Sequence, residues 1–167
     1  ILHLAGLSHS DIPKQYDDVN TEGTRCLLGV CAPNAFFVYL STRCAHPDGG
    51  DYALSKLRAE QAVMSSGLRY AVVRPAEVYG TKEGEGIDRL IQLALRYRVV
   101  LDFRQDGASA YAPISADEVV CFLVEAVEHQ RRYMSVHTLC AENSSTANDI
   151  CRELTRFRRR RHFVLLF

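Results

Sequence analysis

Residues 36–42 read Phe36-Phe37-Val38-Tyr39-Leu40-Ser41-Thr42, an apolar run that ends in two hydroxyl side chains. An unbroken apolar run of this length is typical of a strand that is buried on both faces of its sheet. Similar runs lie before and after it in the chain, at Ile1–Ala5 and at Tyr70–Val73. The first part of the sequence therefore predicts three buried strands.

Two helical patterns separate these strands. In the first, Asp11-Ile12-Pro13 opens a helix, and apolar side chains then recur at steps of mostly three and four residues as far as Cys31. The second helix covers Tyr52–Ser66 and ends at Gly67. Buried strands that alternate with helices of this length need crossover connections, so we expect an α/β fold with a parallel sheet.

The pattern changes after Gly80, where a charged, glycine-containing loop begins. The remaining sequence predicts helices at Ile87–Tyr97, Ala116–Glu128 and Thr146–Phe157 (with Thr146 as N-cap) and short strands at Val99–Leu101, Ala112–Ile114 and Val136–Leu139.

Composition argues against several classes of protein. The 167 residues contain 20 Lys+Arg and 20 Asp+Glu, and a formal net charge of zero disfavours a general nucleic-acid binder. No apolar run reaches the ~18 residues of a membrane span, and no secretory signal pattern is present. We therefore expect a cytoplasmic protein without nucleic-acid or membrane partners, and we interpret the basic run Arg156–His162 as a solvated helix end.

The six cysteines are interpreted as scattered reduced thiols. No pair of them has C-x-x-C spacing, and no histidine stands at zinc-ligand spacing from a cysteine pair, so we expect no metal site. Cys26, Cys121 and Cys151 fall in apolar helical patterns, and we expect them to be buried.

Tyr52 and Lys56 lie one helical turn apart, so both side chains project from the same face of their helix. A phenol is a poor base at neutral pH, and a nearby ammonium group lowers its pKa. Such a pair can transfer a proton at a carbinol or a carbonyl group. The alternative is a core tyrosine beside a solvated lysine.

Ser41 and Thr42 follow the strand at Phe36–Leu40, and ligands in open α/β sheets bind beyond the carboxyl ends of the strands. Residues 74–80 follow the next strand and reach the same edge of the sheet. The alternative for both segments is structural: the two hydroxyl groups cap a loop, and Pro75 ends an ordinary strand exit.

These segments occur in the order of a known family. The sequence resembles the extended short-chain dehydrogenase/reductase family, in its NAD-dependent epimerase/dehydratase branch. The matching segments are His3–Gly6, the N-x-x-G-T motif at Asn20–Thr24, the strand Val38–Thr42, the Y-x-x-x-K motif Tyr52–Lys56, the R-P-x-x-V-Y-G loop Arg74–Gly80 and the later segment Pro113–Val119.

The resemblance implies a Rossmann-like doubly wound parallel sheet, present here in its C-terminal portion only, with a small C-terminal substrate subdomain. Residues 1–80 are expected to form the catalytic second half of an NAD(P)-binding domain. Residues 81–167 are expected to form a mixed substrate-binding subdomain with returning elements of the core sheet. The family's G-x-x-G-x-x-G phosphate loop is missing, and Gly80, Gly84 and Gly86 do not follow its spacing, so we expect an N-terminal truncation upstream of Ile1.

The resemblance also implies the chemistry. The expected cofactor is NAD or NADP, and the expected reaction is hydride transfer at a hydroxyl or carbonyl carbon of a sugar nucleotide or another small molecule. Such an enzyme is an oxidoreductase, an epimerase or a dehydratase. Tyr52 would be the acid/base, Lys56 would lower its pKa and bind the nicotinamide ribose, and Thr42 would orient the substrate oxygen, with Ser41 as a neighbour or substitute.

The resemblance also implies residues that contact the cofactor or the substrate without taking part in proton transfer. The family pattern gives Ala5, Gly6, Arg74, Pro75 and Val78 as cofactor contacts, Glu77 and Tyr79 as substrate contacts, and Asn20 as a structural or water-organising residue. A homodimer through the helices at Asp11–Cys31 and Tyr52–Ser66 is possible. Two alternatives stay open: a non-catalytic NAD(P)-binding relative, and a fragment without activity of its own.

Overall fold

The computed structural model of the protein describes residues 1–80, 87–97, 99–102, 111–146, 149–150, 153 and 163–166. The chain divides into two compact units. Ile1–Pro75 and Val119–Leu139 form the first unit, and Ala76–Glu118 and Cys140–Phe167 form the second. The boundary thus falls after Pro75 rather than after Gly80, and one later segment returns to the first unit.

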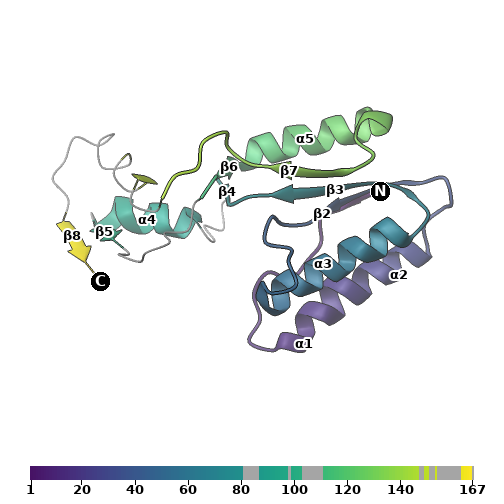
Figure 1. The fold of residues 1–167 in the computed structure, drawn as a ribbon, viewed down its shortest axis with the longest axis horizontal. Coiled ribbons are helices and arrows are strands. Elements are labelled where there is room, and N and C mark those ends of the chain that lie inside the picture. Colours follow the sequence, from purple (N-terminus) through teal and green to yellow (C-terminus); the bar gives the residue numbers. More distant parts are fainter. Residues whose placement is uncertain are drawn as a thin grey trace. The chain divides into compact units, whose positions relative to one another are not determined.

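A four-stranded parallel sheet forms the centre of the first unit (Figure 1). Its strands are β1 (Leu2–His3), β2 (Phe36–Leu40), β3 (Arg69–Pro75) and β7 (Val136–Leu139), in the order β1-β2-β3-β7. Every neighbouring pair is parallel. The expected parallel α/β sheet is therefore confirmed.

Helices cover both faces of this sheet. One face carries a continuous helical segment made of α1 (Pro13–Tyr16), η1 (Asp17–Glu22) and α2 (Gly23–Gly29), followed by α3 (Gly50–Ser65), and α5 (Ala116–Glu128) lies on the other face (Figure 1). This two-sided arrangement confirms the Rossmann-like, doubly wound class. The core on the α3 side consists of fully buried side chains from two strands and the helix: Phe37, Tyr39, Ala59, Val63 and Val72.

The first helical segment contains a feature that the sequence did not indicate. The repeat of apolar residues predicts one regular helix, whereas Asp17–Glu22 form a π-helix. Asn20 and Thr21, adjacent in sequence, are both turned inward and only 1% exposed. Single π turns inside helices occur frequently at functional sites, and this one brings two polar side chains into the interior.

In the second unit the described elements are short. β4 (Val78–Tyr79) pairs in parallel with β6 (Ile114–Ser115), β5 (Val99–Asp102) pairs in parallel with β8 (Phe163–Leu166), and α4 spans Ile87–Tyr97. β6 begins at the last residue of the strand predicted at Ala112–Ile114.

Two helix starts in this part of the chain are capped by side chains. At α5, the Ser115 hydroxyl accepts a hydrogen bond from the Glu118 amide, and the Glu118 carboxylate accepts from the Ser115 amide and hydroxyl. The predicted cap at Thr146 is confirmed, because the amide of Asp149 donates to its Oγ1 (3.2 Å). Most of the helix predicted at Thr146–Phe157, together with Gly84, Gly86 and Arg156–His162, lies outside the described residues.

The expected burial of the cysteines is wrong where the structure describes them. Cys26 on α2 and Cys121 on α5 are exposed, and Cys151 lies outside the described residues. On α5, the inward face is formed by Val119, Leu123 and Ala126, which leaves Cys121 on the outer side. The apolar pattern fixed that a helix forms but not which of its apolar side chains face the sheet. Within the described ranges, no group of side chains is arranged to hold a metal ion, and no helix is long and apolar enough to cross a membrane.

Candidate active site

The candidate site lies at the carboxyl end of β2, where the chain leaves the sheet. Beyond the strand, the amide of Ser41 donates to the Val73 carbonyl (2.7 Å) and the amide of Arg43 donates to the Pro75 carbonyl (2.9 Å). The exit of β2 is therefore fixed against the exit of β3. Ser41 is buried, and its hydroxyl has no hydrogen-bond partner among the described residues, whereas Thr42 is half-buried.

Tyr52 lies in the first turn of α3 and is half-buried. Its ring packs edge-on against Tyr16 at 5.9 Å between centroids. Burial raises the pKa of the Tyr52 phenol, the nearby Cys44 thiol raises it further, and a hydrogen bond with the Thr42 side chain lowers it. Tyr52 and Thr42 are thus brought together as expected.

The expected lowering of the pKa of Tyr52 by Lys56 is wrong for this structure. The net shift of that pKa is upward, because burial outweighs the other causes and Lys56 is not one of them. The ammonium group of Lys56 is instead directed at the sheet. Its Nζ donates to the Leu40 carbonyl (2.8 Å) and lies 4.4 Å from the centre of the Tyr39 ring.

Lys56 is itself strongly perturbed. It is only 5% exposed, and burial lowers its pKa to about 8, while the carboxylate of Glu60 opposes that shift. The carbonyl and ring contacts hold the ammonium group in one position beside the strand end. At neutral pH the group therefore remains mostly charged at the edge where the Tyr52 and Thr42 hydroxyl groups lie.

Glu60 is the residue that sequence reasoning missed. Its side chain is fully buried one turn after Lys56, and its carboxylate accepts from Nε (2.9 Å) and from Nη2 of Arg74. This pair raises the pKa of Arg74 and turns its side chain toward α3. A signal was present, because Glu60 stands between the core residues Ala59 and Val63 on the inward face of the helix.

Asn20 connects the loop after β1 to α3. Its Oδ1 accepts from the Leu7 amide (2.7 Å), and its Nδ2 donates to the Leu7 carbonyl (3.1 Å) and to the Ser55 hydroxyl (3.0 Å). Ser55 in turn donates to the Tyr52 carbonyl (2.7 Å). The amide side chain therefore links the helical turn of Tyr52 to the segment that contains Gly6.

Gly6 lies close to these groups. A Cβ atom at this position would come 3.2 Å from Asn20 Oδ1 and 3.5 Å from Lys56 Nζ. The glycine leaves open the space beside the ammonium group that a side chain would fill. Ala5 is exposed next to it, and Pro75 is buried at the end of β3.

The three remaining expected contacts belong to the second unit. The Glu77 carbonyl accepts from the Ile114 amide (3.0 Å), and its carboxylate accepts from the Ala112 amide (3.2 Å). Val78 is half-buried and Tyr79 is exposed in β4. The first unit thus brings together Gly6, Asn20, Ser41, Thr42, Tyr52 and Lys56, while Glu77 joins its own strand to the segment that leads into β6.

A comparison with protein families finds a match over most of the chain. Residues 11–161 match the RmlD substrate binding domain. The chain belongs to this family. The match confirms the resemblance to the NAD-dependent epimerase/dehydratase branch that the ordered motifs indicated, and it covers both units of this family member.

Individual relatives share its sequence or its fold. The ceramide reductase of Caulobacter vibrioides is 31% identical over 125 residues, which are 74% of this chain and 38% of that protein. The UDP-glucuronic acid 4-epimerase from Bacillus cereus in complex with NAD has a TM-score of 0.82 at 18% identity, covering 99% of this chain and 61% of that one. TunA, an NAD-dependent NDP-hexosamine 5,6-dehydratase of tunicamycin biosynthesis, has a TM-score of 0.75 at 22% identity, covering 99% and 62%. The chain therefore spans less than two thirds of the length of these relatives, and the structural matches confirm its fold.

Proposed function

We propose that the chain carries the proton-transfer site of an NAD(P)-dependent enzyme that acts on a hydroxyl or carbonyl carbon. The observation that carries this proposal is the meeting of Thr42, Tyr52 and Lys56 at the carboxyl end of β2. Two hydroxyl groups near each other, beside a buried ammonium group, are suited to bind a substrate oxygen and to move its proton.

The residues at this edge fit a dinucleotide cofactor. The unfilled space at Gly6, next to Lys56 Nζ, admits a ligand close to the backbone, and the buried Ser41 hydroxyl has no partner among the described residues. Lys56 and Tyr52 would contact its ribose, Ala5 and Gly6 would line it, and the backbone of Arg74 and Pro75 would close the same edge. Val78 stays a predicted contact from the second unit. When bound, the cofactor supplies or accepts a hydride.

Tyr52, Thr42 and Lys56 have different roles in the transfer of the proton. Tyr52 donates its phenolic proton to a carbonyl oxygen or accepts one from a hydroxyl group, and Thr42 holds that oxygen in reach. The cation of Lys56 stabilises negative charge that develops at this edge. The Tyr52 phenol, whose pKa is raised by burial, is protonated at neutral pH and so has a proton to donate to a carbonyl oxygen, and this shift by itself favours neither direction of the reaction.

The substrate class follows from the relatives only as a proposal. The ceramide reductase favours reduction at a carbonyl group, and the epimerase and dehydratase favour a nucleotide sugar. We favour the reductase, because it shares 31% identity with this chain over 125 residues. Glu77 and Tyr79 stay predicted substrate contacts.

The test is Tyr52→Phe in the protein expressed from its complete coding sequence. We expect kcat to fall by about 10³-fold, because general acid–base catalysis contributes on that order, while NADH or NADPH affinity stays within about twofold. Reductase turnover is followed by the loss of reduced-nicotinamide absorbance with a keto form of ceramide as substrate. Turnover of UDP-glucuronic acid by epimerisation is redox-neutral and is followed by chromatography of the product. Tyr70→Phe, at a half-buried tyrosine in β3, is the matched control and should retain full activity. Unchanged turnover in Tyr52→Phe would remove the phenol from the reaction.

The predicted homodimer and the predicted cytoplasmic location are separate proposals. The outer face of α2 and α3 is the surface through which the dimer would form. Sedimentation equilibrium distinguishes a dimer from a monomer directly.

A further inference from the structure

Three arginines, Arg69, Arg131 and Arg132, lie together at the amino end of the sheet in the first unit, away from the candidate active site. They surround a pocket of about 540 Å³ that is lined by Arg69, Glu128, His129, Gln130, Arg131 and Arg132. Arg69 is the first residue of β3, and the others stand at the end of α5 and in the turn η2 (Gln130–Arg132). With ~3.3 Å per strand residue, Arg69 lies roughly 20 Å from Pro75, so this pocket is distinct from the candidate active site.

Backbone hydrogen bonds fix the turn that carries Arg131 and Arg132. The amide of Arg132 donates to the His129 carbonyl (2.9 Å), and the amide of Tyr133 donates to the Gln130 carbonyl (3.1 Å). Tyr133 is buried, its ring packs edge-on against Phe122 at 5.1 Å, and its phenol donates to the Glu125 carboxylate. The anchored tyrosine thus fixes the turn that presents Arg131 and Arg132.

The positive charge in this pocket is not balanced by ion pairs. Within the described part of the chain, neither Arg69, Arg131 nor Arg132 forms a salt bridge, and Arg69 donates to the backbone carbonyl of Asn34 (2.7 Å). Glu128 is the acidic residue in the lining. Three arginines and one carboxylate therefore line this pocket, and the guanidinium group of Arg132 lies 6.0 Å from the centre of the Tyr133 ring.

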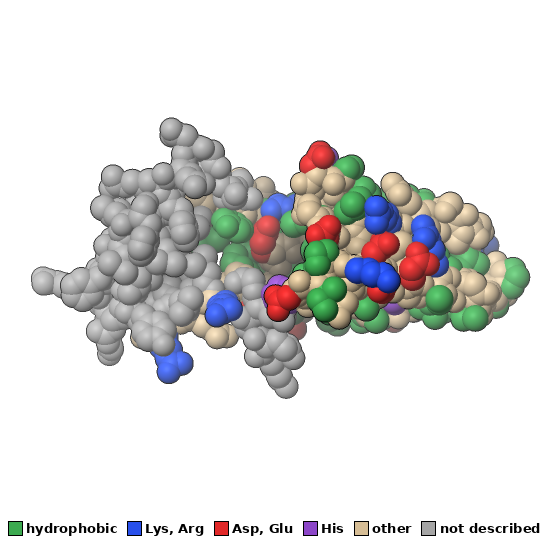
Figure 2. Space-filling view, turned by 90° about the horizontal axis from the view of Figure 1, so that it is seen from below, with side chains coloured by type: hydrophobic (Ala, Val, Ile, Leu, Met, Phe, Trp, Pro, Cys, Tyr) green, Lys and Arg blue, Asp and Glu red, His purple; other side chains and the backbone are tan. Residues whose placement is uncertain are grey.

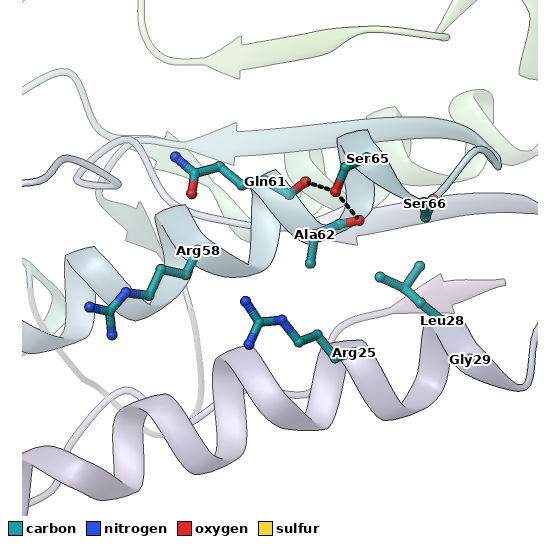
Figure 3. A pocket seen from close by; sticks show the side chains of 8 residues that line it. All are labelled: Arg25, Leu28, Gly29, Arg58, Gln61, Ala62, Ser65 and Ser66. Carbon is teal, nitrogen blue, oxygen red and sulfur yellow. Dashed lines mark hydrogen bonds between the residues drawn. The ribbon is translucent and has the colours of Figure 1, made fainter.

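The other arginine-lined pocket of the first unit provides a contrast. This pocket of about 440 Å³ lies between α2 and α3 (Figure 3). There Arg25 is paired with Glu22, and Arg58 is paired with Asp17. Figure 2 shows cationic and acidic side chains side by side on the face that is seen from below. The two arginines of that pocket thus each have an acidic partner.

The dipole of helix α5 explains the position of only some of the arginines in the pocket at the amino end of the sheet. Cations just beyond the end of a helix are stabilised by its dipole, which accounts for Arg131 and Arg132 after α5. It does not account for Arg69, which comes from β3 and adds its charge to the same pocket.

We propose that the pocket formed by Arg69 with His129, Arg131 and Arg132 is a binding site for a phosphate group. A guanidinium group offers two parallel donors to an oxyanion, and the oxygens of one phosphate can accept from several such forks. A phosphorylated soluble compound and a phospholipid headgroup share this chemistry. The site goes beyond the proposed function and would act at the edge of the sheet opposite to it.

The test uses pyrophosphate as the probe, titrated into the full chain by calorimetry. We expect one saturable site whose affinity falls at least tenfold in Arg69→Gln/Arg131→Gln, because each charged hydrogen bond contributes more than a factor of about ten. Arg25→Gln/Arg58→Gln removes two arginines from the other pocket and is the matched control, expected to bind normally. Circular dichroism confirms that both variants fold. Absence of saturable binding at about 10 mM probe, or equal weakening by both variants, overturns the proposal.

A second arm distinguishes the two sources of phosphate. The wild type and both variants are mixed with vesicles that contain phosphatidic acid and are then floated. Binding that is lost in Arg69→Gln/Arg131→Gln alone supports a lipid headgroup. Pyrophosphate binding without vesicle binding supports a soluble compound. Vesicle binding that persists in this variant, without pyrophosphate binding, contradicts the site.

Discussion

The buried pair of Glu60 and Arg74 yields the sharpest prediction about stability. Glu60→Gln removes the carboxylate charge and keeps the shape of the side chain, so the guanidinium group of Arg74 loses its counter-ion. Breaking a fully buried ion pair costs about 3–5 kcal/mol. Because the Arg74 side chain is 28% exposed and water can reach it, we expect a loss of about 2–3 kcal/mol in the free energy of unfolding. For a chain of this size that corresponds to a fall of about 4–10 °C in Tm.

Urea unfolding followed by circular dichroism measures this loss, and Glu22→Gln is the matched control. Glu22 forms an ion pair with Arg25 in which both side chains are about half exposed, so its removal should cost less than about 1 kcal/mol. A double-mutant cycle with Arg74→Met then isolates the interaction between the two side chains.

The double variant separates a buried charge from a lost contact. Replacing both partners by apolar residues, as in Glu60→Leu/Arg74→Met, removes the unpaired charge at Arg74 and should recover part of the stability lost in Glu60→Gln, although Lys56 still lacks the nearby carboxylate. If Glu60→Gln costs no more than Glu22→Gln, and the cycle gives no coupling, then the pair contributes nothing and the reasoning is refuted.

Three further substitutions test other parts of the structure. Lys56 has a pKa of about 8 in the folded protein and 10.5 in the unfolded chain, so the unfolded chain binds more protons between these two pH values. The free energy of unfolding should therefore rise by about 3 kcal/mol as the pH increases from about 8 to 10.5. Lys56→Met should lack this rise in urea unfolding at about pH 7.5 and 10, and an identical rise would contradict the burial argument. Gly6→Ala places a methyl group 3.2 Å from Asn20 Oδ1 and 3.5 Å from Lys56 Nζ, so it should lower Tm slightly and weaken NADH binding several-fold in fluorescence titration. Unaltered binding would place the cofactor elsewhere. Ser115→Ala removes the cap of α5 and should cost about 1 kcal/mol in urea unfolding, with no change expected if the cap is redundant.

The elements of this fold follow from local pattern wherever one side of the element faces the core. Ile87–Tyr97, Ala116–Glu128 and Val136–Leu139 are observed with the predicted bounds. Phe36–Leu40 is likewise observed as predicted, because a run without polar residues can only be placed between two covering layers. The S-x-x-E pattern that begins at Ser115 is itself typical of a capping box, which is the arrangement that the structure has.

Features set by contacts between distant residues did not follow from pattern. The π-helix at Asp17–Glu22 lies between two α-helical stretches, and nothing in the repeat of apolar residues marks it. Cys26 and Cys121 were assigned to the interior because they are apolar, but the position of the neighbouring sheet decides which apolar side chains of a helix it covers.

The same distinction applies within the candidate site. Thr42, Tyr52 and Lys56 stand in short motifs, and the topology alone brings them to one edge of the sheet. The groups that hold Lys56 in place lie outside its own motif. The Leu40 carbonyl accepts a hydrogen bond from the Lys56 ammonium group, and the Glu60 carboxylate favours the charged form of that group. Because a buried cation is stable only with such partners, the position of Lys56 depends on residues that its own motif does not contain. It follows that a chain with the same motif but without a buried acid one turn later would hold its lysine differently. Glu60→Gln should also lower the pKa of Lys56, so any activity that needs the charged form of Lys56 should be lost at a lower pH than in the wild type.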